Sequence, residues 1–125
     1  MSHSELKVWV IDFREVDYEI WLDWMVAGSN PDYNALDRFY DMYFTGNFQG
    51  LAVVHEEDPL GLLVAATANP GDIVWFDCPA GPAQTQVAGL LLNEYCHRTG
   101  LEAFALRLVM QECPEETGTL FRSFF

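Results

Sequence analysis

Basic side chains are scarce in this sequence. Its 125 residues include six lysines and arginines against 19 aspartates and glutamates, which gives a formal charge of −13 at pH 7. Proteins bind a nucleic-acid backbone by neutralising its phosphates with Lys and Arg, and they bind anionic membrane surfaces in the same way. The composition therefore argues against direct nucleic-acid binding and against membrane binding, and it predicts a basic or neutral partner.

Cysteine is also sparse, and long apolar runs are absent. The three cysteines, Cys78, Cys96 and Cys113, are widely spaced and form no C-x-x-C pair, so we expect neither a zinc ribbon nor any other metal site. No apolar run reaches the ~18 residues of a membrane span. The first seven residues are polar and include Glu5, which is not typical of a signal peptide. We therefore expect an intracellular, cytoplasmic protein.

Apolar residues, in contrast, are abundant: half of the chain is hydrophobic and 14% is aromatic, which excludes intrinsic disorder. The length favours one domain over residues 1–125. Hydrophobic periodicity and turn residues predict an alternation of strands and helices. The expected strands are 8–11, 51–55, 62–68, 73–78 and 101–110, and the expected helices are 16–26, 31–44, 85–98 and a short one after Pro114. The strand at 101–110 is apolar on both faces, so we expect it to be central.

Carboxylates gather on the first two predicted helices. Residues 1–58 hold 12 acidic and three basic residues, a net charge of −9, whereas the remainder carries −4. Side chains four residues apart share a helix face, so these acids form stripes that lack compensating lysines. An aromatic residue beside such charge is typical of a protein-binding surface. The predicted partner-binding residues are Glu15, Glu19, Asp23, Trp24, Asp37 and Asp41.

The element order resembles that of the GCN5-related N-acetyltransferase (GNAT) family. Three features carry the resemblance: the opening 10–13 followed by a helix, the hairpin 54–61 ending in a glycine, and the run 89–92 before Gly100 and the alternating 101–109. The resemblance implies an α/β (α+β) fold with a mixed central sheet flanked by helices, in the order β-α-α-β-β-β-α-β-α. The family's final strand pair is absent, and its motifs are degenerate.

The family's coenzyme, acetyl-CoA, implies a pyrophosphate site at a helix N-terminus, with the pattern Gln or Arg, two residues, Gly, one residue, Gly or Ala. Gln86 and Gly89 match its first two positions, and Leu91 breaks the third. The alternative interpretation of Gly89 is close packing of the helix against the sheet. The tyrosine that the family uses as a general acid corresponds to Phe121, which has no exchangeable proton.

No catalytic residue is therefore assigned. Asp77, Glu56 and Glu57 are candidate general bases, and each is otherwise a solvated carboxylate.

These departures favour a non-catalytic, acetyltransferase-like acidic protein that acts by binding another protein, as a viral accessory or virion component does, and that needs no cofactor. One alternative is an active N-acetyltransferase using acetyl-CoA. Another is an acidic mimic of nucleic acid that inhibits a basic host protein. The chain ends in Leu120, Phe121, Phe124 and Phe125, for which we expect an exposed apolar edge covered by a second copy or by a partner.

Overall fold

The computed structural model describes residues 7–29, 33–79, 81–109 and 115–124. Its elements follow the predicted order. The strands are β1 (Trp9–Asp12), β2 (Phe48–His55), β3 (Asp58–Ala66), β4 (Asp72–Asp77) and β5 (Arg107–Leu108). The helices are α1 (Tyr18–Ser29), α2 (Tyr33–Phe44), α3 (Gln84–Thr99) and α4 (Glu115–Arg122), with 3₁₀ turns η1 (Phe13–Glu15) and η2 (Ala103–Ala105).

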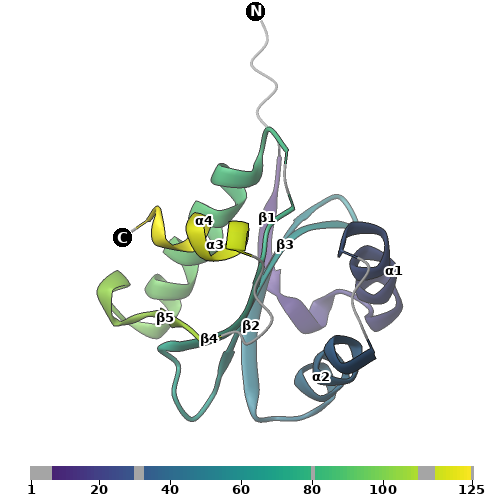
Figure 1. Ribbon diagram of the computed structural model, residues 1–125, viewed down its shortest axis with the longest axis horizontal. Helices are drawn as coiled ribbons and strands as arrows, with labels where there is room; N and C mark the ends of the chain where they lie inside the picture. Colours follow the sequence, from purple (N-terminus) through teal and green to yellow (C-terminus); the bar gives the residue numbers. More distant parts are fainter. Residues whose placement is uncertain (1–6, 30–32, 80, 110–114, 125) are drawn as a thin grey trace, which may run out of the picture.

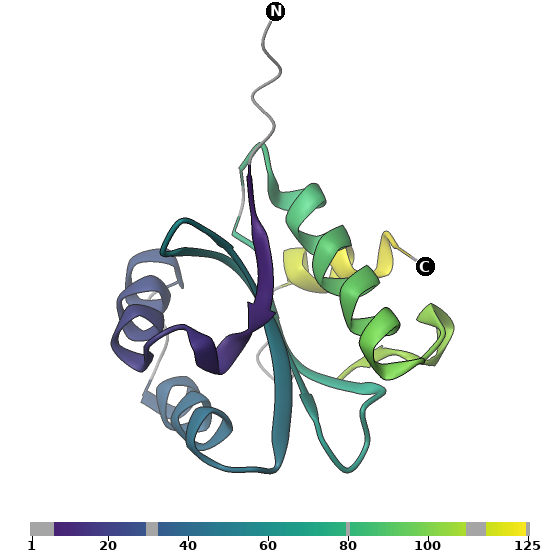
Figure 2. The same cartoon turned by 180° about the vertical axis from the view of Figure 1, so that it is seen from behind.

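The five strands form one mixed sheet in the order β1-β2-β3-β4-β5. Neighbours from β1 to β4 are antiparallel, and β5 runs parallel to β4 because α3 carries the chain back between them. Helices α1 and α2 cover one face of the sheet, and α3 and α4 cover the other (Figure 1). Figure 2 shows the same layers from behind. The predicted mixed sheet flanked by helices is confirmed.

Each face of the sheet has its own hydrophobic core. Successive side chains of a strand point to opposite faces. Leu51 and Val53 of β2 therefore pack toward α3, and Ala52 and Val54 pack toward α1 and α2. Because both faces are covered, the central strands are continuous apolar runs rather than alternating ones.

Two local expectations are corrected. The β2–β3 turn consists of Glu56 and Glu57 alone, so β3 starts at Asp58, earlier than the predicted 62. The predicted strand 101–110 is not central: among its described residues, 101–109, only Arg107–Leu108 form a strand, which lies at the edge of the sheet. Phe104 in this run is 84% exposed, which shows that a segment with apolar residues at alternating and intervening positions is not always buried on both faces.

The end of the chain is better covered than expected. Phe121 is 4% exposed and packs edge-on against Phe76, with ring centroids 5.5 Å apart. Leu120 and Phe124 are half-buried against the same core. The prediction that these three residues are exposed is therefore wrong, because α4 folds back onto α3. Phe125 lies outside the described residues. A second copy or a partner at this end stays a prediction.

Candidate functional site

Strand β4 contains a bulge at Val74. Ala65 of β3 pairs with Ile73 and Val64 pairs with Trp75, so Val74 is an extra residue on the β4 side. Both Val74 and Trp75 consequently pack toward α1 and α2, although successive residues normally face opposite sides. Nothing in the apolar run 73–76 marks this bulge in the sequence.

In the described residues, the pairing of β5 with β4 ends at this bulge. The two strands pair only at Asp72 and Ile73, and the nitrogen of Val109 donates the last bond, 2.8 Å long, to the carbonyl of Ile73. The junction is braced at its start, where Arg107 Nε donates to Asp72 Oδ1 at 2.6 Å. Beyond Ile73, β4 has β3 on one side and no described strand on the other. Among the described residues, β4 therefore has an unpaired edge beyond Ile73, which we call the β4–β5 opening.

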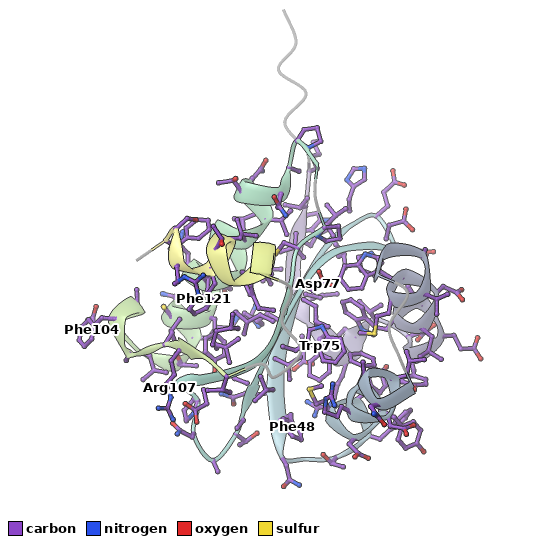
Figure 3. The ribbon with its side chains drawn as sticks, in the orientation of Figure 1. Phe48, Trp75, Asp77, Phe104, Arg107 and Phe121 are labelled. Atoms are coloured by element: carbon purple, nitrogen blue, oxygen red, sulfur yellow. The ribbon has the colours of Figure 1, made fainter. Side chains whose placement is uncertain are left out.

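A cavity of about 610 Å³ lies beside the bulge. Figure 3 shows Asp77, Trp75 and Phe48 following one another along the sheet, with Phe48 at the cavity end. The polar residues that line the cavity include Thr45, whose Oγ1 is buried without a hydrogen-bond partner in the described part of the chain. A ligand in the cavity could satisfy this oxygen. The full lining is Arg38, Asp41, Met42, Thr45, Asn47, Phe48, Val74 and Val109.

The partly buried side chain of Arg14 stabilises the wall of the cavity that α2 forms. The Arg14 guanidinium donates to four main-chain carbonyls at the end of α2 and just beyond it, over distances of 2.7 to 2.9 Å. Carbonyls at a helix C-terminus lack partners within the helix, and a cation there also complements the helix dipole. The carbonyls belong to Met42, Tyr43, Thr45 and Phe48. Arg14 is thus engaged in structure.

Asp77 ends β4 on the face that α1 and α2 cover, since it pairs with Leu62 of that core. Burial raises the pKa of the Asp77 carboxyl above its ordinary value. No hydrogen-bond donor reaches this carboxylate in the described residues. Of the three candidate bases, Asp77 is therefore a desolvated carboxylate rather than a solvated one, whereas Glu56 and Glu57 are exposed at the hairpin turn.

The helix α3 that follows β4 has an uncapped N-terminus. Its N-cap residue, Ala83, makes no side-chain cap, and the first turn contains no acidic residue. Gln86 lies in this first turn and is exposed. Gly89 lies farther along, where its nitrogen belongs to the helix ladder, and a Cβ there would stand 3.3 Å from the Phe124 ring. Gly89 thus accommodates the Phe124 ring just after α4, and the close contact is not with the sheet as the packing interpretation has it.

The predicted acidic residues are exposed, whereas Trp24 is only partly so, and their common role in binding a partner stays a prediction. Glu15 closes a capping box by accepting from the Asp12 nitrogen at 3.1 Å, as the Asp12–Glu15 spacing predicts. Trp24 is half-buried, with its ring 5.2 Å from that of the buried Trp21. Its role in the core competes with any role in binding. The exposed carboxylates are Glu15, Glu19, Asp23, Asp37 and Asp41.

Cysteine chemistry and metal binding find little support in the described residues. Burial, followed by the charge of Asp77, raises the pKa of the Cys78 thiol to about 12, so it is not a thiolate at neutral pH. Across the described ranges, no three His, Cys, Asp or Glu side chains gather closely enough to hold a metal ion. Cys113 lies outside these ranges. Among the described helices, none has the length and apolar character needed to span a membrane.

Known proteins resemble this chain in structure but not in sequence. No protein-family model matches it, and no curated protein matches it in sequence. It is similar to the crystal structure of the aminoglycoside acetyltransferase meta-AAC0020, from an uncultured soil metagenomic sample, in complex with sisomicin. That similarity has a TM-score of 0.52 at 11% identity and covers 94% of this chain and 85% of that one. The trehalose complex of the same enzyme gives 0.49 at 12%, covering 94% and 84%. The chain thus has a GNAT-like fold.

Proposed function

We propose that this protein is an acyltransferase that binds acetyl-CoA in the opening between β4 and β5 and transfers the acetyl group to an amine. The observation that carries the proposal is the position of the cavity at the Val74 bulge, where the pairing of β5 with β4 ends in the described residues. The acetyltransferase fold supports this function over the non-catalytic binding protein that the sequence favours.

The groups around the opening suit the two ends of such a coenzyme. The uncapped first turn of α3 offers backbone N–H groups to a pyrophosphate, and no carboxylate in that turn opposes an anion. Gln84 braces the preceding loop by donating to the Cys78 carbonyl at 2.8 Å. Thr85 and Gln86 are the residues whose main chain would hold the pyrophosphate. Bound there, acetyl-CoA would supply an activated thioester, whose C–S bond is exchanged for a C–N bond.

Asp77 is the residue to which we assign the proton transfer. An amine attacks only after it loses a proton, and a carboxylate with a raised pKa is a better acceptor for that proton than a solvated one. The proton passes from the acceptor ammonium to Asp77 and then to water. Phe121 is buried against Phe76 and carries no proton, so water must protonate the departing thiolate.

The test measures thiol release from acetyl-CoA by the wild type and by Asp77→Asn, with polyamines and amino sugars as acceptors. We expect turnover by the wild type, a loss of about 100-fold or more in the variant, and equal acetyl-CoA affinity for both. Glu57→Gln, at the exposed hairpin turn, is the matched control and should keep full activity. Coenzyme binding without turnover on any amine would refute catalysis, and equal rates for Asp77→Asn and the wild type would refute the role of Asp77.

A further inference from the structure

The outer side of α2 interleaves aromatic rings with carboxylates. Asp37, Tyr40, Asp41 and Phe44 stand at i, i+3, i+4 and i+7 and so share one face of the helix. The side chains of Tyr40 and Phe44 are 53% and 56% exposed. Hydrophobic periodicity predicts that both rings lie on the apolar face of helix 31–44, together with Tyr33, Leu36, Phe39 and Tyr43. Instead the buried Phe39 and Met42 turn toward the sheet, which leaves Tyr40 and Phe44 at the surface.

These rings form a rigid platform with one residue of α1. The rings of Tyr40 and Phe44 are 4.7 Å apart, and that of Tyr18 lies 5.7 Å from the first and 5.1 Å from the second. Tyr18 in turn stacks on the fully buried Phe39, at 5.9 Å and an interplanar angle of 9°. A partner would therefore meet side chains that are already ordered, so little conformational entropy is lost on binding. We call Tyr18, Tyr40 and Phe44 the aromatic patch.

Negative charge surrounds the aromatic patch. Burial raises the pKa of the Tyr18 hydroxyl, and the charges of Tyr40 and Asp37 raise it further. Within the described part of the chain, neither Asp37 nor Asp41 forms an ion pair. The cation of Arg14 is occupied by the carbonyls at the end of α2. The Arg38 side chain lines the cavity, and so does that of Asp41, which lies at the border between the cavity and the aromatic patch.

We propose that the aromatic patch, with Asp37 and Asp41, binds an arginine- or lysine-containing segment of a protein partner. A guanidinium stacks on an exposed ring while its N–H groups reach a neighbouring carboxylate, and both features recur along this face. The rings pack against one another rather than around a hollow, so the surface suits an extended chain better than a small cation. The stripe from 37 to 44 is about 10 Å long, enough for three extended residues.

The rings are tested with a fluorescent nona-arginine peptide, whose binding is followed by anisotropy at about 150 mM salt. Tyr40→Leu with Phe44→Leu removes both aromatic faces and preserves charge and helix propensity. Two exposed cation–π contacts of about 0.5–1 kcal/mol each predict a loss of affinity of about tenfold. Phe104→Leu, which removes an exposed ring from η2, is the matched control and should bind within about twofold of the wild type. Circular dichroism confirms that each variant is folded.

The carboxylates are tested with the same peptide. Asp37→Asn with Asp41→Asn should weaken binding more than Glu56→Gln with Glu57→Gln, although both pairs remove two negative charges. Equal losses from both pairs, or equal affinities for the two leucine variants, would show that only net charge matters and would overturn the proposal. Absence of binding by the wild type would also overturn it. Tyr40 and Phe44 do not line the cavity, so the double leucine variant should bind acetyl-CoA as the wild type does, and its loss of peptide binding is separable from the proposed catalysis.

Discussion

Arg14 and Tyr43 bind each other's main chain. Arg14 Nε donates to the Tyr43 carbonyl at 2.9 Å, and the Tyr43 hydroxyl donates to the Arg14 carbonyl at 3.2 Å. The same hydroxyl lies 2.8 Å from the carbonyl of Val16. Together these bonds tie η1 to the end of α2, and thereby hold the helix that lines the cavity at a defined distance from the sheet.

Loss of the Arg14 guanidinium should be costly. Arg14→Met keeps the apolar stem but leaves four carbonyls without their donor, and hydrogen bonds to a charged group contribute about 1.5–3 kcal/mol each, not additively. We expect the free energy of unfolding to fall by about 3 kcal/mol or more in urea titrations. Arg98→Met is the matched control: it removes an exposed ion pair with Glu94 and should cost less than about 1 kcal/mol. Similar losses for the two variants would contradict this role of Arg14.

Gly71 should be required for the β4–β5 junction. A Cβ at this position would stand 2.7 Å from the main-chain oxygen of Ala105, which cannot move without displacing η2. Gly71→Ala should therefore cost about 1–3 kcal/mol and speed hydrogen exchange at the nitrogens of Arg107 and Val109, which bond to β4 and its approach. Gly46→Ala, where a Cβ meets nothing within 4 Å, should change neither. Unchanged exchange in Gly71→Ala would show that the junction tolerates the clash.

The contact between Gly89 and Phe124 should appear as energetic coupling. Gly89→Val places a branched side chain against the Phe124 ring, and we expect a loss of about 1–3 kcal/mol by overpacking. In the double variant with Phe124→Ala the clash is relieved, so the two losses should sum to more than the loss observed. Strict additivity in a thermodynamic cycle would mean that α4 does not depend on this glycine.

The charge of Asp77 should destabilise the fold at neutral pH. Its folded pKa lies above the unfolded one, so the penalty is absent below the unfolded pKa and grows as the pH rises through the folded value. Asp77→Asn should therefore raise Tm at pH 7, and the difference from the wild type should shrink toward zero near about pH 3.5. Glu57→Gln should leave Tm nearly unchanged at both values. A Tm difference for Asp77→Asn that does not vary with pH would argue against desolvation of this carboxyl.

Much of the fold follows from local sequence signals. Helical periodicity identifies α1, α2 and α3, and the Asp12–Glu15 capping box and Gly100, whose φ is 75°, mark helix boundaries through local geometry. The order of elements then leads to the GNAT-like sheet. These signals predict the elements correctly because each depends on residues within one or two helical turns of each other.

The candidate site depends on non-local packing, which periodicity does not encode. The Val74 bulge arises from the pairing of β3 with β4, and the unbroken apolar run 73–76 contains no residue that indicates a bulge. The interior role of Arg14 and the outward turn of Tyr40 depend on where α2 lies against the sheet. The length of β5 depends on its pairing with β4 and on the elements that pack against it, and neither is encoded in the apolar pattern of 101–110. The sequence identifies Asp77 as a candidate base, but it does not indicate that the carboxylate is desolvated.

The position of the coenzyme is the central claim, and an NMR titration with acetyl-CoA tests it most directly. The account predicts that amide resonances of Trp75 and Asp77 in β4 and of Thr85 and Gln86 in α3 shift first, with the shifts saturating below about 1 mM ligand, a binding free energy of more than about 4 kcal/mol. Absence of shifts at that concentration, or shifts confined to α1 and α2, would contradict it.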